Sequence, residues 1–389
     1  MWSYFFHLST QLTIEIYSST AQLPKNWSNL ANENIFLSRE YLEILEKSAP
    51  TNMTCHFIGF FNEKELVGIA LSQFLDLNKL ESFGERDKCI KTSVRNIIFK
   101  NFCSHVLIIG NNMLTGQNTY FFSDKIDKIQ ALKTLKNASE QLKTLFIKKG
   151  FKIHVTTFKD FPKENIPDFQ LAGFQDSYQF STQPNMLFEI PNRWKSEQDY
   201  IDALSKKYRD QYKRARKKAE GILKRKMNLE DIIKHEEIIY DLYHHVAKNA
   251  HFNTFFLAKN HFSTFKQLLK DEFLLYGYFL DEKLIGFNTI IKNGEVIDTY
   301  FLGYDETIQR EKMLYLNMLY DMIAYSINNG FKKIIFARTA LEIKSSVGAK
   351  PQEMFGFMKH DNPIIDLAID KVFCYLDPEV VWKERNPFK

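Results

Sequence analysis

The sequence predicts an α+β protein with two tandem lobes, each a mixed, mostly antiparallel sheet flanked by helices. The first observation behind this prediction is length, because 389 residues exceed one ordinary core and suit two lobes of roughly 150–200 residues each. The second is composition, with 44% hydrophobic and 25% charged residues, which is typical of a folded protein and not of a disordered chain. The third is an internal repeat.

Two short motifs occur twice along the chain, in the same order each time. Gly59–Gly68 aligns without a gap on Gly277–Gly286, and each segment indicates a strand, a charged turn and a second strand. Ile147–Lys152 matches Ile327–Lys332, and in both a glycine ends a helix before a β-rich run begins. Because the two motifs keep their order, a duplication explains them better than chance.

Lobe boundaries follow from the repeat. The first half holds about 38 extra residues between its two motifs, and we expect this insertion within Asn78–Asn118. We predict an N-terminal lobe over residues 1–190 and a C-terminal lobe over residues 191–389. Pro184–Trp194 is expected to cross from one lobe to the other.

Six segments of the second half are predicted as strands, the first three because they are rich in β-branched and aromatic residues and are joined by short turns. These segments are Leu274–Leu280, Leu284–Ile291, Val296–Gly303, Lys332–Ala337, Phe355–Lys359 and Asp366–Leu376. Between the third and the fourth, Leu314, Met318 and Met322 recur at helical spacing and predict a helix over Lys312–Asn329.

A long basic helix is predicted from Ser196 to Lys226, at about residues 197–226 of the C-terminal lobe. One face begins an apolar stripe with Tyr200, Leu204 and Tyr208. The other face carries eleven basic residues and two acidic ones, namely Lys206, Lys207, Arg209, Lys213, Arg214, Arg216, Lys217, Lys218, Lys224, Arg225 and Lys226 with Asp210 and Glu220. A charged face is usually only solvated, but it then mixes signs, so this one favours a polyanion such as tRNA, an acidic carrier protein or the lipid phosphates of a membrane surface.

Four segments of the second half resemble a known family. Tyr300–Asp305, the helix through Tyr315–Tyr320, Gly330–Lys332 and Arg338–Ala349 resemble GNAT (N-acetyltransferase) superfamily acyltransferases labelled as peptidoglycan-biosynthesis proteins. Those are similar to the Fem-type aminoacyl transferases, which build peptidoglycan cross-bridges and also have tandem GNAT lobes. The resemblance implies that an acyl carrier lies in the gap between the strand Val296–Gly303, which corresponds to the fourth strand of the GNAT fold, and the helix after it.

The loop before that helix departs from the family pattern. A GNAT phosphate loop is rich in glycine, whereas Asp305–Lys312 contains none and offers only Arg310 and Lys312 to phosphates. The loop therefore does not favour ordinary acetyl-CoA. An aminoacyl-tRNA, an acyl carrier protein or a long-chain acyl-CoA held elsewhere would all be compatible.

Strand alternation places Asp298, Tyr300 and Tyr304 on one face of the third strand. A mid-strand carboxylate beside two phenols suits a proton acceptor with donors to a leaving group. The alternative is an aspartate that is only paired with a neighbouring strand.

Arg338 and Lys344 lie where the fourth strand should end beside the expected gap. Thr339 and Glu342 between them form a capping-box pattern, which needs no function. Arg338 and Lys344 are not needed for the cap and could bind a phosphate or a substrate carboxylate.

The candidate catalytic residues are therefore Asp298, Tyr304 and Lys344. The candidate residues for binding substrate or phosphate are Arg338, Tyr300, Asp305, Arg310, Lys312, Lys213, Arg214 and Lys217. No metal is expected, because His244, His245 and His251 do not converge by helix geometry. Motifs of serine hydrolases and P-loop enzymes are absent from the sequence.

These features together predict an N-acyltransferase. It would move an acyl group from a thioester or ester carrier, such as acyl-CoA or acyl carrier protein, to an amine of a lipid or cell-envelope precursor. One alternative is a Fem-like transferase that uses aminoacyl-tRNA to modify peptidoglycan, and another is a non-catalytic polyanion-binding protein. Four scattered cysteines and no continuous apolar run favour a cytoplasmic protein, with a peripheral position at the inner membrane as the alternative.

Overall fold

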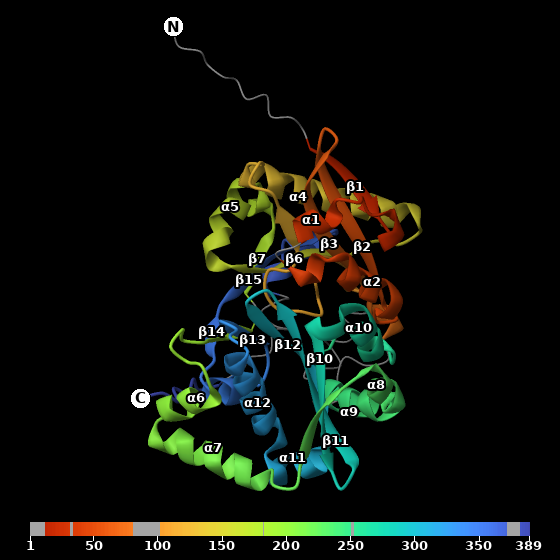
Figure 1. Ribbon diagram of the computed structural model, residues 1–389. Helices are drawn as coiled ribbons and strands as arrows, with labels where there is room; N and C mark the ends of the chain where they lie inside the picture. The colour runs from red at the N-terminus through yellow and green to blue at the C-terminus, as the bar shows by residue number, and fades with distance from the viewer. Residues whose placement is uncertain (1–11, 32–33, 81–101, 182, 250–252, 372–381) are drawn as a thin grey trace.

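The computed structural model describes the chain except for residues 1–11, 32–33, 81–101, 182, 250–252 and 372–381. Two sheets lie one above the other along the long axis of the molecule, with helices against their faces (Figure 1). The predicted α+β architecture of two mixed sheets is confirmed. The upper sheet belongs mainly to the N-terminal lobe and the lower one to the C-terminal lobe.

The N-terminal sheet has the order β1-β2-β3-β4-β6-β15-β7, and β5 pairs with β3. Its strands are β1 (Thr13–Tyr17), β2 (Met53–Asn62), β3 (Glu65–Asp76), β4 (His105–Ile109), β5 (Tyr120–Phe122), β6 (Val155–Pro162), β7 (Tyr178–Ser181) and β15 (Met354–His360). The helices of this lobe are α1 (Trp27–Ala31), α2 (Arg39–Ser48), α4 (Lys128–Lys148) and α5 (Ile166–Leu171), with short 3-10 turns that include η2 (Ile35–Leu37).

The C-terminal sheet has the order β14-β8-β13-β12-β11-β10-β9. Its strands are β8 (Asn185–Glu189), β9 (Leu223–Met227), β10 (Phe273–Leu280), β11 (Lys283–Asn293), β12 (Val296–Tyr304), β13 (Lys333–Ala337) and β14 (Lys350–Gln352). The helices are α6 (Glu197–Ala203), α7 (Lys206–Lys218), α8 (Leu229–Lys234), α9 (Glu236–Lys248), α10 (His261–Leu269), α11 (Glu306–Lys312), α12 (Leu314–Asn328) and α13 (Leu341–Ser346). α14 (Pro363–Asp366) follows β15 and packs against it in the N-terminal sheet.

The two halves repeat one topology down to a local irregularity. The aligned motifs form the hairpins β2–β3 and β10–β11. The first hairpin has a bulge between Phe60 and Phe61, and the second has one between Tyr278 and Phe279, which are the aligned positions. Each lobe also contains a parallel pair in the same place in its sheet, β4 with β6 and β12 with β13. A shared bulge is hard to obtain by chance, so the duplication read from the motifs is real in the fold.

The sheets exchange one strand each. β8 lies before residue 190 but sits between β13 and β14 in the C-terminal sheet. β15 lies after residue 190 but sits between β6 and β7 in the N-terminal sheet. The connections from β7 to β8 and from β14 to β15 therefore cross between the lobes side by side.

The prediction of one continuous basic helix is wrong. The segment forms α6, then α7, then the edge strand β9. Leu204 is extended and ends α6, and Gly221 adopts a φ of 87° in the turn that leads into β9. Lys224, Arg225 and Lys226 consequently lie on a strand paired with β10 and not on a helix.

Two other elements differ from expectation. The helix predicted over Lys312–Asn329 is present as α12, but the segment before it, which was expected to be a loop, forms α11, and Met313 with a φ of 49° separates the two helices. The last predicted strand, Asp366–Leu376, is helical or turned as far as residue 371, and the rest lies outside the described residues. The predicted insertion at Asn78–Asn118 is also described only in part.

The lobes share a hydrophobic core. One cluster joins Phe36 and Tyr41 of the N-terminal lobe to Phe265, Phe273 and Phe287 of the C-terminal lobe. The rings of Tyr41 and Phe265 meet edge to face with 5.9 Å between their centroids. This shared core fixes how the two sheets face each other.

Candidate active site between the two lobes

The C-terminal sheet opens between β12 and β13. These parallel strands pair at only three positions, Val296–Asp298 against Lys333–Ile335, and then separate. We call this point the C-lobe fork. Beyond it, Thr299–Leu302 of β12 are half-buried, because the strand has lost its neighbour on that side.

Asp298 is the last paired residue of β12 at the C-lobe fork. Its side chain is buried, and its Oδ2 atom has no hydrogen-bond partner in the described part of the chain. Burial raises the pKa of Asp298 to about 7, and the neighbouring Asn293 side chain opposes this shift only in part. A carboxyl group with such a pKa exchanges its proton near neutral pH, as a general base must.

The predicted alternation along β12 is wrong at the end of the strand. Tyr300 and Phe301 together span the distance that Thr289 alone spans on β11, so β12 carries a bulge. Tyr300 packs against the core shared with the N-terminal lobe, whereas Tyr304 packs against the opposite core beneath α12. Tyr304 therefore does not share a face with Asp298.

Tyr300 is held by a histidine that sequence reasoning missed. His261 of α10 is fully buried, and its Nδ1 lies 3.0 Å from the carbonyl oxygen of Ser48. A carbonyl can only accept, so Nδ1 carries the proton and Nε2 is the acceptor. The Tyr300 hydroxyl, 3.0 Å from Nε2, must donate to it. Burial also lowers the pKa of His261 to about 4, which keeps the ring neutral.

Lys344 of α13 points its ammonium group at the end of β13. Nζ donates to the carbonyl oxygens of Phe336 at 2.5 Å, Ala337 at 3.3 Å and Arg338 at 2.6 Å. Burial lowers the pKa of Lys344 to about 7. Because these three carbonyls occupy its donors, Lys344 holds the turn after β13 in place.

That turn is strained. Ala337, Thr339 and Ala340 have φ values of 58°, 67° and 47°, in the left-handed region that such residues rarely adopt. Backbone of this kind costs about 1–3 kcal/mol a residue and often lies at functional sites. The expected capping box does not form, because the left-handed backbone moves the N-cap of α13 to Ala340, and Glu342 pairs with Arg385 instead.

Arg338 connects the C-lobe fork to the other lobe. Its guanidinium forms an ion pair with Asp160 of β6, and its Nε donates to the carbonyl oxygen of Gln183 at 3.2 Å. Asp160 is 2% exposed, has a φ of 69° and also lies 2.6 Å from the ammonium of Lys159. Arg338 is thus already matched by a buried carboxylate.

The N-terminal sheet has an equivalent fork between β4 and β6, which we call the N-lobe fork. Pairing ends at Ile109 and Phe158. The chain then fills the space with the loop Gly110–Thr119, most of which is buried. Lys159 pins this loop by donating to the carbonyl oxygens of Asn111 at 3.1 Å and Leu114 at 3.2 Å.

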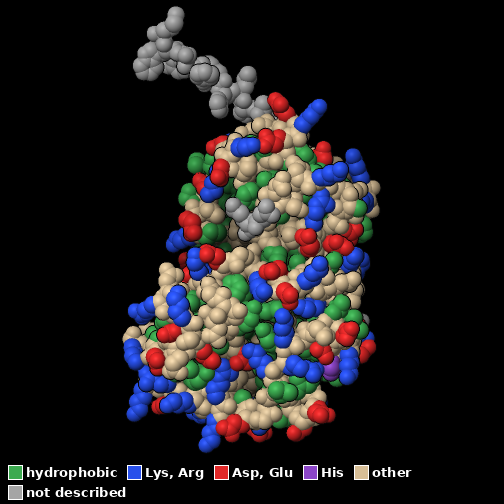
Figure 2. Space-filling view, in the orientation of Figure 1, with side chains coloured by type: hydrophobic (Ala, Val, Ile, Leu, Met, Phe, Trp, Pro, Cys, Tyr) green, Lys and Arg blue, Asp and Glu red, His purple; other side chains and the backbone are tan. Residues whose placement is uncertain are grey.

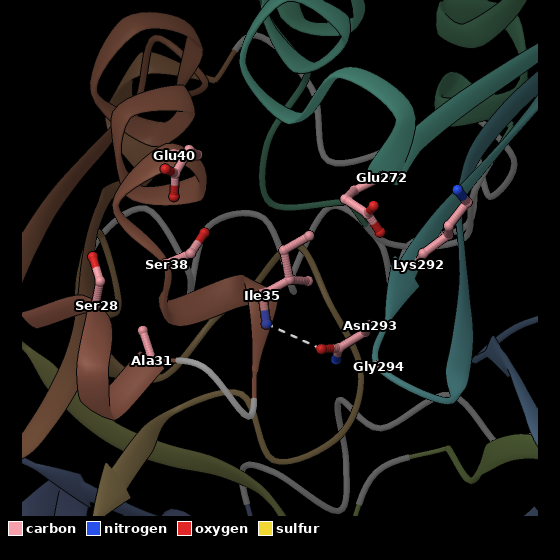
Figure 3. Close-up of a pocket in the computed structure, with 9 residues that line it drawn as sticks. All are labelled: Ser28, Ala31, Ile35, Ser38, Glu40, Glu272, Lys292, Asn293 and Gly294. Carbon is pink, nitrogen blue, oxygen red and sulfur yellow. Dashed lines mark hydrogen bonds between the residues drawn. The ribbon is translucent and has the colours of Figure 1, made fainter.

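A cavity of about 330 Å³ lies between the lobes (Figure 3). Its walls are α1, η2 and the start of α2 on one side and the turn from β11 to β12 on the other. Glu40 and Glu272 contribute acidic side chains from opposite lobes, and Lys292 contributes a basic one. Asn293 lines the cavity and accepts a hydrogen bond from the backbone N–H of Ile35 at 3.0 Å. The Asn293 side chain also interacts with Asp298, so the cavity lies at the start of β12, on the paired side of the C-lobe fork.

The predicted phosphate loop is folded as α11. Asp305 caps this helix by accepting from the backbone N–H of Thr307 at 3.0 Å. Arg310 is exposed, and Lys312 reaches the carbonyl oxygen of Glu220 at 3.4 Å. α11 therefore stands where an open, glycine-rich loop would admit phosphates to the start of α12.

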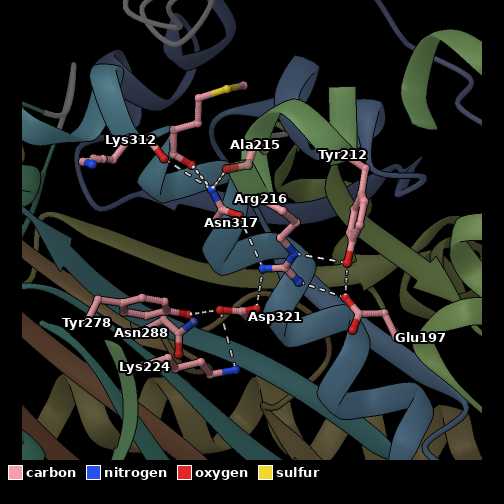
Figure 4. Close-up of polar contacts among 11 residues, drawn as sticks. Glu197, Tyr212, Ala215, Arg216, Lys224, Tyr278, Asn288, Lys312, Asn317 and Asp321 are labelled. Carbon is pink, nitrogen blue, oxygen red and sulfur yellow. Dashed lines mark hydrogen bonds and ion pairs between the residues drawn. The ribbon is translucent and has the colours of Figure 1, made fainter. Parts of the chain in front are cut away.

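Polar side chains also close the start of α12 (Figure 4). The Asn317 side-chain amide donates to the carbonyl oxygens of Ala215 at 2.9 Å and Met313 at 3.1 Å. Arg216 donates to Asp321 at 2.7 Å and to Glu197 at 2.8 Å. A smaller cavity of about 230 Å³ remains beside them, lined by Arg216, Ala219, Ile222, Lys224, Tyr278, Leu314, Asn317 and Asp321.

The other basic candidates lie away from both forks. Lys213, Arg214 and Lys217 are exposed on α7. Asp298 and Tyr300 thus lie on β12 at the C-lobe fork, and Arg338 and Lys344 hold the turn after β13, which forms its other side. Tyr304, Asp305, Arg310 and Lys312 lie on or beyond the α12 side. Among the described residues, no three His, Cys, Asp or Glu side chains are placed to share a metal ion. None of the helices described is long and apolar enough to cross a membrane.

Comparison with solved structures decides the fold. The crystal structure of FemX matches with a TM-score of 0.53 at 12% identity, over 88% of this chain and 97% of FemX. The C-terminal domain of a putative lysylphosphatidylglycerol synthetase from Agrobacterium fabrum matches with a TM-score of 0.51 at 8% identity, over 93% of this chain and 99% of that one. A tandem GNAT protein from the clavulanic acid biosynthesis pathway matches with a TM-score of 0.50 at 8% identity, over 90% and 99%. This chain has a Fem-like tandem GNAT fold.

The match covers both lobes of this tandem GNAT chain, so the fold implied by the resemblance is confirmed. No protein-family model matches the sequence, and no curated protein matches it. At identities this low the likeness establishes the architecture, and function has to be argued from the site.

Proposed function

We propose that this protein is an N-acyltransferase whose reaction takes place at the C-lobe fork. The observation that carries the proposal is Asp298, a buried carboxylate with an unpartnered oxygen at the point where β12 and β13 separate. Tandem GNAT architecture supports it, since solved proteins with this architecture include FemX and a putative lysylphosphatidylglycerol synthetase.

In the proposed reaction, an amine nitrogen attacks the carbonyl carbon of a thioester or ester. A new C–N bond forms, the C–S or C–O bond to the carrier breaks, and the carrier leaves with the electron pair. Asp298 accepts the proton that the amine loses, and the carrier takes up a proton as it leaves. The bulge at Tyr300 and Phe301 leaves one residue of β12 outside the ladder, which suits a backbone N–H that holds the oxyanion.

The acceptor would enter through the cavity between the lobes. Glu40 and Glu272 line it from opposite sides and suit a substrate that carries an ammonium group. Tyr300 offers its oxygen lone pairs to the amine, because its own proton is directed at His261. Lys344 and Arg338 would act by holding the strained turn that forms the other side of the fork.

The carrier is proposed to be one that does not rely on a glycine-rich phosphate loop, because α11 and the Asn317 contacts fill that place. Long-chain acyl-CoA and acyl carrier protein remain the first choice. Aminoacyl-tRNA is the alternative ester carrier, which the resemblance to Fem-type aminoacyl transferases implies. One solved protein with this fold is named a putative lysylphosphatidylglycerol synthetase.

The test compares lipids and muropeptides by mass spectrometry in a deletion strain, its parent, and strains complemented with the wild type or with Asp298→Asn. We expect an amide-linked species to disappear on deletion and to return with the wild type only. A missing acyl-lipid amide would identify a lipid N-acyltransferase, and a shortened cross-bridge would identify an aminoacyl transferase. Full restoration by Asp298→Asn would refute the proposed role of the fork.

A further inference from the structure

The basic residues that the sequence groups into one face are divided by the structure into three sets. Lys224, Arg225 and Lys226 of β9 are paired with carboxylates, namely Asp321 at 3.6 Å, Asp231 at 3.5 Å and Asp271 at 3.2 Å. Arg209 and Arg216 of α7 are turned inward, toward the carbonyl oxygen of Leu204 and toward Asp321. What is left is a set of six cations on α7.

These six residues, which we call the α7 cationic face, are Lys206, Lys207, Lys213, Arg214, Lys217 and Lys218. All six are exposed, and none forms an ion pair within the described part of the chain. Their spacing places them along one side of a helix that is about 20 Å long. Asp210 is the acidic residue that interrupts the face. The basic side chains gather at the lower left of the molecule, where Figure 1 places α7 (Figure 2).

The opposite side of α7 explains why the face is presented rigidly. Tyr208 and Ala215 are buried beneath the helix. Arg216 fastens it to α6 through Glu197 and to α12 through Asp321. The helix cannot roll to hide its charges without breaking these contacts. A fixed row of unpaired like charges costs self-repulsion, which an anionic surface would relieve.

We propose that the α7 cationic face docks the protein on an anionic phospholipid membrane. A cluster of four to eight lysine and arginine residues on one helix face is typical of binding to anionic lipid head groups. Five of the six are lysines, whose compact charges suit a diffuse lipid surface, whereas arginine is preferred for forked contacts with nucleic acid.

The surroundings of the helix also favour lipid over RNA. Leu223, the first residue of β9, is 64% exposed shortly after the end of α7, where a lipid head-group layer can receive it. The tyrosines of α7 offer no free platform for stacking bases, because Tyr208 is buried and the ring of Tyr212 packs against Tyr320 and Arg216. This inference stands apart from the proposed transfer reaction, since none of these residues lies at the C-lobe fork.

The experiment is co-sedimentation of the full-length protein with vesicles of phosphatidylcholine alone or with about 30% phosphatidylglycerol, at about 0.1 M salt. We expect binding to the anionic vesicles only. The variant Lys213→Glu/Arg214→Glu/Lys217→Glu should bind them at least about a hundredfold more weakly, since each basic residue at such a surface strengthens binding about fivefold.

The matched control is Lys25→Glu/Lys64→Glu/Lys133→Glu, which makes the same change in net charge at three exposed lysines of the N-terminal lobe. It should bind as the wild type does, and both variants should melt at the wild-type temperature. Equal loss in the control would mean that only net charge matters and would overturn the proposal. So would equal binding to neutral vesicles, or displacement of the wild type from anionic vesicles by bulk tRNA, which would assign the face to nucleic acid.

Discussion

The two forks share one topology but differ in what fills them. At the N-lobe fork, β4 ends at Ile109, and the loop Gly110–Thr119, held by hydrogen bonds from Lys159, fills the space. At the C-lobe fork, β12 continues past its last partner to Tyr304 and its side chains stay half-buried. The residue across from Ile291 on β12 is Asp298, and the residue at the corresponding position of the first lobe is Ile108. Duplication therefore supplied two scaffolds, and the ionisable groups of the N-lobe fork, Lys159 and Asp160, are paired with each other, whereas Asp298 has no charged partner in the described part of the chain.

The fork to which we assign the proposed reaction is the one whose buried polar groups have fewer partners. Lys159 donates to two carbonyl oxygens and pairs with Asp160, which also pairs with Arg338, whereas the Oδ2 atom of Asp298 has neither a hydrogen bond nor an ion pair among the described residues. A buried, unpartnered carboxylate lowers stability, and such costs are retained where chemistry needs them.

The largest expected effect is the loss of acyl transfer when Asp298, the residue that distinguishes the C-lobe fork, is replaced. Asp298→Asn keeps the shape of the side chain but removes the proton acceptor, so acyl transfer should fall by about 10²–10⁴-fold. The control Asp127→Asn changes an exposed cap of α4 and should leave the rate unchanged. A rate for Asp298→Asn within threefold of the wild type would mean that another group takes the proton.

The next effect is on stability as a function of pH. Burial raises the pKa of Asp298 to about 7 in the folded protein, while an unfolded aspartate titrates near ~4. The folded state therefore holds an extra proton between these values, and stability should fall as pH rises from about 4 to 7. The total is on the order of 4 kcal/mol.

Urea unfolding at several pH values measures this slope. Asp298→Asn should lack it and should be more stable than the wild type above pH ~7, although it is inactive. Transfer should show the opposite trend and rise through the same range, because the ionised carboxylate is the base. If the dependence of stability on pH persists in Asp298→Asn, it must come from another titratable group.

A smaller effect separates the two buried lysines. Lys159→Met leaves Asp160 buried with one cation fewer and frees the loop that closes the N-lobe fork, so it should cost about 3 kcal/mol of unfolding free energy. Lys344→Met removes hydrogen bonds to carbonyls only and should cost about 1–2 kcal/mol. Lys133→Met, at an exposed position on α4, is the surface control. If Lys344→Met lowered the free energy of unfolding more than Lys159→Met, the contacts of Lys159 would not be what stabilises the N-lobe fork.

The smallest effect concerns the hydroxyl of Tyr300. His261→Asn can still donate to the Ser48 carbonyl but loses the acceptor for Tyr300, so kcat should fall about tenfold with little change in KM. Tyr300→Phe should have a similar effect, and the double variant should be no worse than either single one, because both remove the same contact. Additive losses would show that His261 serves the fold and not the orientation of Tyr300.

Much of the fold could be predicted from local patterns. The hairpins and the helix-ending glycines carry their signals within about ten residues, so the motif pairs at Gly59–Gly68 and Gly277–Gly286 were sufficient to find the duplication. The break at Leu204 was missed because basic and apolar periodicity continues across it. The helix α11 was missed because Asp305–Lys312 holds a single apolar residue, Ile308, and so shows no apolar stripe. Strand exchange was also missed, since no local pattern tells a strand which of two similar sheets it joins.

The site was only partly predictable. Asp298, Tyr300, Arg338 and Lys344 were found because polar residues near strand ends are conspicuous in an apolar sequence. The bulge at Tyr300 and Phe301 adds one residue to β12, so side chains after it lie on the opposite face from the one that simple alternation predicts. Tyr304 was therefore assigned to the wrong face. His261 carries no local signal at all. Lys159 and Asp160 did offer one, as adjacent charges inside the apolar strand Val155–Pro162.

Because of the strand exchange, the N-terminal sheet cannot be completed until β15 has been synthesised. β7 and β8 are made together, but β15 follows roughly 170 residues later. At about 5–20 residues per second, the N-terminal sheet waits on the order of 10–30 seconds on the ribosome with an empty slot between β6 and β7. Two unpaired strand edges face each other across that slot, and any extended peptide nearby can occupy it. The N-terminal sheet is therefore completed only when nearly all of the chain has been made.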